Sequence, residues 1–108
     1  MINTIMQAAG IPYRRTRYPG PPGTKYAVYH DSVTTDGPDG INAIYTHDYT
    51  VELYTHDPEE ADEAEASMEE ALDAAGIVWS KQDRYWLQSE QRYQTIYEFT
   101  HIEKRRIE

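Results

Sequence analysis

The sequence contains no cysteine. Disulfides, thiolate zinc sites and cysteine nucleophiles are therefore excluded, while the redox compartment stays undetermined. No apolar run approaches the roughly 20 residues that a membrane-spanning helix needs. The N-terminal stretch MINTIMQAAG also lacks the charged-then-apolar layout of a signal peptide. We therefore expect a soluble protein that is not exported through a signal sequence and does not bind a membrane.

Basic residues are scarce and unevenly placed. Ten Lys and Arg stand against 19 Asp and Glu, which gives a formal net charge of −9. Broad nucleic-acid binding needs a basic face, so this balance argues against it. Every charge between residues 57 and 73 is negative, and every side-chain charge up to residue 25 is positive, from Arg14, Arg15, Arg17 and Lys25. The basic segment fits either a strand edge guarded by cations or a patch for an acidic neighbour, such as another copy of the chain.

The spacing of apolar residues predicts an α+β fold in a single domain, residues 1–108. We expect a short helix over residues 2–9 and one long helix over about 58–75, both packed on a mostly antiparallel sheet of about four to five strands. Asp57, Pro58 and Glu60 have the order of a helix start, and Gly76 marks its end. Strands are expected over 11–18, 24–33, 43–57, 77–88 and 91–102, with a flexible loop at 34–42 and a fraying tail at 103–108.

Ten tyrosines are many for a chain of 108 residues. Most lie in the alternating segments, where tyrosine packs well on a sheet. A surplus facing outward would indicate a protein interface, because tyrosine is enriched there.

Three motifs suggest a nucleotide-binding, metal-binding or catalytic site, but none has the full pattern that such a site needs. GPPGTK at residues 20–25 lacks the spacing, the second glycine before the lysine, the following Ser or Thr and the helix of a phosphate-binding loop. It is better interpreted as a rigid loop that leads into the strand KYAVYH. Three His-Asp pairs begin at His30, His47 and His56, and we interpret them as strand surface, with His30 and His47 able to meet across strands. The carboxylates from Glu59 to Glu70 are interpreted as a solvated helix face. No catalytic residue, cofactor site or metal site is expected.

The order of the segments resembles the tail-terminator or tail-completion proteins of long-tailed (siphovirus-type) bacteriophages and prophages. The resemblance rests on a short helix ending in AAGIPY, on KYAVYH after the Pro/Gly loop, on VELYTHDPEEADEAEASMEEALDAAGIVWSK, and on SEQRYQTIYEF near the end. These segments span nearly the whole chain. Each is physically ordinary, so the specificity lies in their order and spacing.

The resemblance implies a structural virion protein rather than an enzyme. Such proteins form a ring, usually of six copies, on the last ring of tail-tube subunits. The ring stops tube growth and forms the joint to the head connector at the neck of the virion. The partners would be the chain itself, the tail-tube protein and the connector or stopper protein, and DNA would pass through without specific binding. Assembly would take place in the host cytoplasm. Two alternatives stay open: a head-tail connector or stopper protein, and a protein-binding domain outside any virion.

A ring needs two different patches on each subunit that complement one another. The basic residues Arg14, Arg15 and Arg17 and the acidic helix are opposite in sign. We therefore expect these arginines to meet an acidic surface between subunits or against an adjacent tail ring, the acidic residues being Glu59, Glu60, Glu63 and Glu70. The alternative is that the acidic face flanks the channel and repels DNA.

Overall fold

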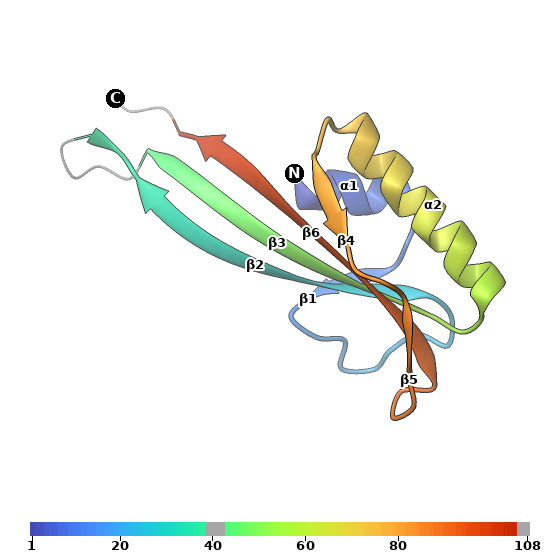
Figure 1. Ribbon diagram of the computed structural model, residues 1–108. Helices are drawn as coiled ribbons and strands as arrows, with labels where there is room; N and C mark the ends of the chain where they lie inside the picture. The colour runs from blue at the N-terminus through green and yellow to red at the C-terminus, as the bar shows by residue number, and fades with distance from the viewer. Residues whose placement is uncertain (39–42, 106–108) are drawn as a thin grey trace.

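The computed structural model describes residues 1–38 and 43–105 and shows an α+β fold, as predicted. Six strands form one sheet and two helices pack on it (Figure 1). The elements in chain order are α1 (Ile2–Ala9), β1 (Tyr13–Arg15), β2 (Tyr26–Asp36), β3 (Ile44–Thr55), α2 (Pro58–Ala74), β4 (Trp79–Lys81), β5 (Tyr85–Leu87) and β6 (Arg92–Lys104).

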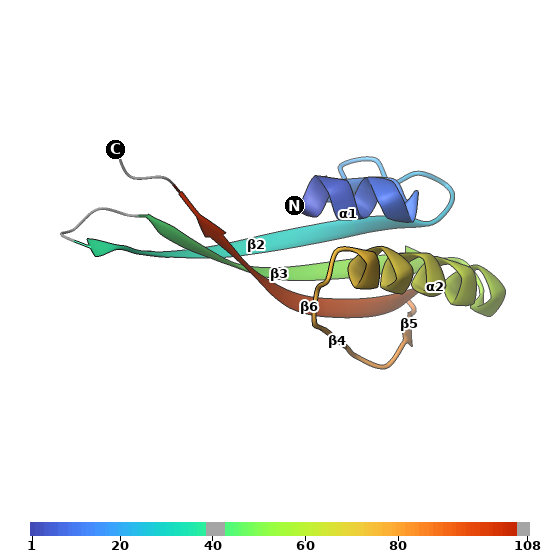
Figure 2. The same cartoon turned by 90° about the horizontal axis from the view of Figure 1, so that it is seen from above.

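The sheet has the strand order β1-β2-β3-β6-β4, and β5 also pairs with β6. The β1–β2 pair is parallel, and the other pairs are antiparallel. Both helices lie on the same face, with α2 over β3 and β6 and α1 beside it (Figure 2). The connection from β1 to β2 runs under the opposite face (Figure 1).

The single strand expected over residues 77–88 is wrong, because the segment forms two short strands. Lys81 lies opposite Tyr97 on β6, and Tyr85 lies opposite Gln94. The edge segment therefore advances four residues, from 81 to 85, while β6 covers three, from 97 to 94. The one extra residue on the edge strand is the mark of a β-bulge. The bulge bends the edge strand at Gln82, whose N–H still donates to the carbonyl of Ile96 at 2.9 Å.

The start of α2 has the predicted capping geometry. The Asp57 carboxylate accepts a hydrogen bond from the Glu60 N–H at 2.8 Å, and the Glu60 carboxylate accepts one from the His56 N–H at 2.8 Å. Pro58 occupies the first turn, where its missing N–H costs nothing. The shorter helix α1 ends at Gly10, whose φ of 69° lies in the left-handed region that glycine adopts without strain.

The core lies between the helices and one face of the central strands. Buried residues of β3 and β6 that share this face alternate with half-buried or exposed ones, as the period of two predicts. Each fully buried side chain of this kind contributes roughly 1.5–3 kcal/mol by removal from water. The largest fully buried apolar side chains are Tyr97, Ile5, Met6, Leu53, Met68, Leu72 and Val51.

The three long strands continue well past the helices (Figures 1 and 2). We call this extension the arm; it consists of residues 30–36 of β2, 44–50 of β3 and 98–104 of β6. It gives the molecule its elongated extents of 51 × 28 × 22 Å.

The arm corrects two boundaries of the sequence interpretation. The loop expected at 34–42 begins later, because Thr34, Thr35 and Asp36 pair with β3. Threonine is β-branched and favours the extended backbone, so the strand continues through this pair. The tail expected at 103–108 also starts later, because Glu103 and Lys104 belong to β6. The rest of those two predictions, at 39–42 and 106–108, falls outside the described residues.

Candidate interaction surfaces

The predicted basic patch lies at the β1 edge of the sheet. Arg14 and Arg15 are exposed on β1, and the strand alternation directs them to opposite faces. Thr16 then adopts a φ of 70°, and Arg17 follows it on the surface. The Arg14 guanidinium lies 5.6 Å from the centre of the Tyr18 ring. None of the three arginines forms an ion pair with another described residue.

The Pro/Gly loop that follows the arginines covers part of the face opposite the helices. Tyr18 meets Tyr26 edge to face at 5.4 Å, and Tyr26 stacks on Tyr54 at 4.9 Å. The Pro22 carbonyl accepts a hydrogen bond from Arg92 at 3.1 Å. The loop leads directly into β2, as predicted, and these contacts give the proline-rich stretch a packing role.

The predicted acidic residues do not all stay free. Glu59, Glu63 and Glu70 are exposed on α2 and form no ion pair within residues 1–38 and 43–105. Glu60 is used locally, because its carboxylate caps the helix at His56. The structure brings none of the four into an ion pair with the arginines of the β1 edge.

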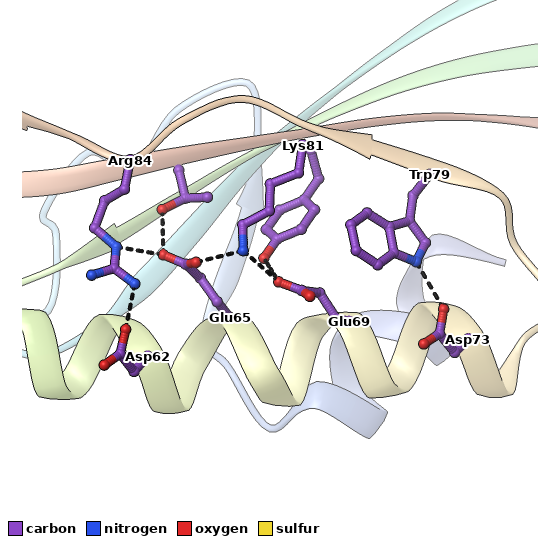
Figure 3. Close-up of polar contacts among 9 residues, drawn as sticks. Asp62, Glu65, Glu69, Asp73, Trp79, Lys81 and Arg84 are labelled. Atoms are coloured by element: carbon purple, nitrogen blue, oxygen red, sulfur yellow. Dashed lines mark hydrogen bonds and ion pairs between the residues drawn. The ribbon is translucent and has the colours of Figure 1, made fainter.

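A second row of carboxylates on α2 faces the β4–β5 segment (Figure 3). Glu65 binds Arg84 at 2.6 Å and Lys81 at 2.7 Å, and the hydroxyl of Thr95 donates to it at 2.8 Å. Arg84 also binds Asp62 at 2.7 Å. The interpretation of residues 59–70 as a solvated face is therefore wrong at Glu65, whose exposed fraction is 6%.

The same row continues toward the end of the helix. Glu69 binds Lys81 at 2.8 Å and accepts a hydrogen bond from the Tyr97 hydroxyl at 2.7 Å. Asp73 accepts one from the Trp79 ring N–H at 2.8 Å (Figure 3). This row, together with its partners, ties the bulged edge of the sheet onto α2. Its spacing, 62, 65, 69 and 73, was visible in the sequence, but its cationic partners follow only after Gly76.

These contacts shift the pKa values of the groups involved. Burial alone raises the pKa of Glu65, but the hydrogen bonds from Arg84, Lys81 and Thr95 outweigh it and hold that pKa below its ordinary value. The same carboxylate hydrogen bonds raise the pKa of Arg84. Burial, followed by the hydrogen bond to Glu69, strongly raises the pKa of Tyr97. Glu65 therefore stays charged at neutral pH, and the row with its partners acts as a structural clamp.

The arm carries a histidine cluster on the face that the helices share. His47 Nδ1 lies 2.9 Å from Asp31, its Nε2 lies 3.3 Å from Glu103, and its ring stacks on His101 at 6.2 Å. The hydrogen bond to Asp31 raises the pKa of His47, burial opposes this, and the hydrogen bond to Glu103 adds to the rise. Among the described residues, no three His, Asp or Glu side chains are placed so that they could hold one metal ion.

His30 and His47, which the sequence left able to meet across strands, do not meet, in agreement with their interpretation as strand surface. His30 pairs with Thr50 and His47 with Val33, so the two rings lie on opposite faces of the sheet. His30 instead lies 3.4 Å from Glu52. His30 and Val33 are three positions apart on β2, and residues that are an odd number of positions apart on a strand point to opposite faces.

An open groove of about 930 Å³ lies where the arm leaves the helices. Its lining is largely apolar and includes Met1, Ile77, Val78, Trp79 and Phe99. In the part of the chain that the structure describes, no helix is both long and apolar enough to cross a membrane.

No protein-family model matches the sequence, and no curated protein matches it. A search of solved structures finds a chain of the structure titled "Virion of native gene transfer agent (GTA) particle". The superposition has a TM-score of 0.56 at 16% sequence identity and covers 89% of this chain and 81% of that chain. At this identity the likeness establishes a shared fold.

Proposed function

We propose that this chain is a structural protein of a phage-like virion that caps the end of the tail tube as a ring, stops tube growth and forms the joint to the head connector. The observation that carries the proposal is the fold, shared over 89% of the chain with a component of a gene transfer agent virion. The order of sequence segments that resembles tail terminators supports it independently. The proposed site is the neck of the virion.

The two unpaired charged surfaces support assembly into a ring. A cyclic ring joins two different patches of each subunit, so the patches must be complementary. The β1 edge with Arg14, Arg15 and Arg17 is positive, and the exposed row of α2 is negative. Because neither surface finds a partner among the described residues of its own subunit, each is available to a neighbour. Because the Glu60 carboxylate already caps the helix, the acidic patch that we propose for the subunit joint consists of Glu59, Glu63 and Glu70.

The role is mechanical and involves no bond making. The interior carboxylates and the arm histidine are held in ion pairs that fix the fold, as in the Glu65 and His47 contacts. Specificity would then lie in shape and charge, which set subunit partners and association rates. Negative charge near the channel would keep the passing DNA from adhering.

The first test is the mass of the purified protein by light scattering, with negative-stain microscopy of the same sample. Rings with a fixed subunit number and a central hole are expected, either in solution or on mixing with tail-tube polymers. Binding to tube ends indicates a terminator, whereas binding to the connector alone indicates a stopper. A chain that stays monomeric and binds neither tube ends nor connector would refute the proposal.

The charge pairing has its own test in two reversed variants. One variant changes Arg14, Arg15 and Arg17 to Glu, and the other changes Glu59, Glu63 and Glu70 to Arg. Each alone should assemble weakly, because like charges then face each other. An equimolar mixture should assemble again, since alternating subunits restore opposite charges at every joint. Assembly of each single variant at wild-type strength across salt concentrations would remove this pairing and leave the ring itself standing.

A further inference from the structure

The arm has two sheet edges that lack a partner strand among the described residues. On one side, β1 covers β2 only at 27–29, so the outer edge of residues 30–36 is open. On the other side, β5 and β4 cover β6 at 92–94 and 97–99, so the outer edge of residues 100–104 is open. Both edges lie in the part of the sheet that extends past the helices (Figure 1).

Hydrogen bonds at the covered parts of the two edges show which residues direct their backbone N–H and C=O groups away from the sheet. The carbonyl of Tyr29 accepts a hydrogen bond from Thr16 on the β1 side at 2.8 Å. Strand alternation then places the groups of Asp31, Val33 and Thr35 on the same outer edge. On β6, the carbonyl of Ile96 accepts from Gln82 on the outer side at 2.9 Å. The groups of Thr100, Ile102 and Lys104 therefore also point outward.

The protection of both edges is partial, because each carries charged side chains, Asp31 and Asp36 on one and Glu103 and Lys104 on the other, but neither is covered by a described segment. Natural proteins block open edges with proline, bulges, charged side chains or a covering segment. Residues 30–36 and 100–104 contain no proline, and each segment exposes an apolar side chain, Val33 at 42% and Ile102 at 55%. Open edges of this kind are templates for another strand.

The topology sets the direction in which two copies can join. β2 and β6 are both antiparallel to β3, so they run parallel to each other. In a cyclic ring, rotation brings β6 of one subunit against β2 of the next in the same direction. Resting on the proposed ring function, we propose that residues 100–104 of one copy form a parallel ladder with residues 30–36 of the next copy.

The charges at the two edges fit this joint. Ile44 pairs with both Asp36 and Lys104, so these two residues lie at the same level and on the same face of the sheet. A level joint between copies places Lys104 of one beside Asp36 of the other, with opposite charges. The same level places Ile102 beside Thr34.

The ladder also sets which face of the sheet lines the channel. The helices occupy one face of the sheet, so they lie outside and the other face lines the channel (Figure 2). That inner face is mostly polar along the arm, with Ser32, Thr34, Thr46, Asp48, Thr50, Glu98 and Thr100, and its apolar members are Ile44 and Ile102.

Disulfide trapping tests the joint directly, because the natural chain has no cysteine. The double variant Thr34→Cys with Ile102→Cys should give, under mild oxidation, a ladder of covalent oligomers up to the ring number. Each single variant alone should give no dimer, and a mixture of the two should give dimers only. Ala66→Cys with Ile102→Cys is the control for random collision, since Ala66 is exposed on α2 away from both edges. Cross-linking no faster than this control would overturn the joint.

A backbone variant gives a second, independent readout. Val33→Pro removes an N–H that has no partner within residues 1–38 and 43–105 of its own copy, whereas Val33→Thr keeps it with a side chain of similar shape. Val33→Pro should melt near the wild-type temperature as a monomer and fail to form rings, and Val33→Thr should assemble normally. One outcome separates the two proposals: the rings cap tubes, Val33→Pro forms them as well as wild type does, and positions 34 and 102 do not cross-link. This outcome would overturn the ladder and leave the proposed function intact. Cross-links in a protein that never binds a tube end or connector would support the ladder and refute the function. If the protein neither cross-links between positions 34 and 102 nor binds a tube end or connector, the ladder and the proposed function are both refuted.

Discussion

Glu65→Gln tests whether the buried carboxylate of α2 clamps the sheet edge. The change keeps the size of the side chain but removes the charge that Arg84 and Lys81 share at 2.6 and 2.7 Å. Removing one partner of a buried ion pair costs about 3–5 kcal/mol. Here the two cations are 24% and 33% exposed and keep Asp62 and Glu69 as partners. We therefore expect a smaller loss of about 2–3 kcal/mol in the free energy of unfolding, close to the value of a few charged hydrogen bonds.

The assay is urea denaturation of the variant beside Glu63→Gln, an exposed carboxylate on the same helix. The control should stay within about 0.5 kcal/mol of wild type. In thermal denaturation of the same proteins, Glu65→Gln should melt about 10–20 °C lower. Because the fold lowers the pKa of Glu65, its contribution is complete above the ordinary value of 4.5 and is lost as the pH falls through the folded value. The difference in the free energy of unfolding between wild type and Glu65→Gln should therefore become smaller at acid pH. Equal losses for the two variants at neutral pH would refute the clamp.

Two further predictions concern the helix start and the arm. Asp57→Ala should lower the free energy of unfolding by about 1 kcal/mol, because the cap of α2 is lost; Asp57→Asn retains an acceptor and should cost less in the same denaturation experiment. His47→Asn should destabilise the protein most below about pH 6.5, the pKa of a free histidine. The folded pKa of His47 is raised by Asp31 and, against burial, by Glu103, so this contribution disappears as the pH rises through the folded value. NMR titration of the His47 ring should show the raised pKa, and an unshifted titration would contradict the contact geometry.

Local signals in the sequence were sufficient for the main elements. The order Asp57, Pro58, Glu60 fixed the start of α2, since each residue has a defined role in the first turn. The alternating segments expected over 43–57 and 91–102 form β3 and β6, and their alternation becomes a buried and a more exposed face. These features depend on neighbours within a few residues, and periodicity records such contacts directly.

The features that were missed depend on contacts between distant segments. Glu65 lies within an acidic stretch, and its burial becomes favourable only because Lys81 and Arg84 fold back onto α2. The split of β4 from β5 comes from a bulge against β6, which no local pattern predicts. Likewise, Arg14 and Arg15 were treated as one patch, but strand alternation puts them on opposite faces.

The β3–β6 ladder has a consequence for how the chain reaches its folded state. Its two strands are separated in sequence by α2 and the short edge strands, and closing a long loop is entropically costly. Thr55 and Tyr93 are the paired residues nearest in sequence, and Ile44 and Lys104 are the farthest apart. We therefore expect folding to start beside the helices and zip toward the tip of the arm. The two open edges would then be the last surfaces to mature, so a subunit becomes competent to join a neighbour only after its core has formed.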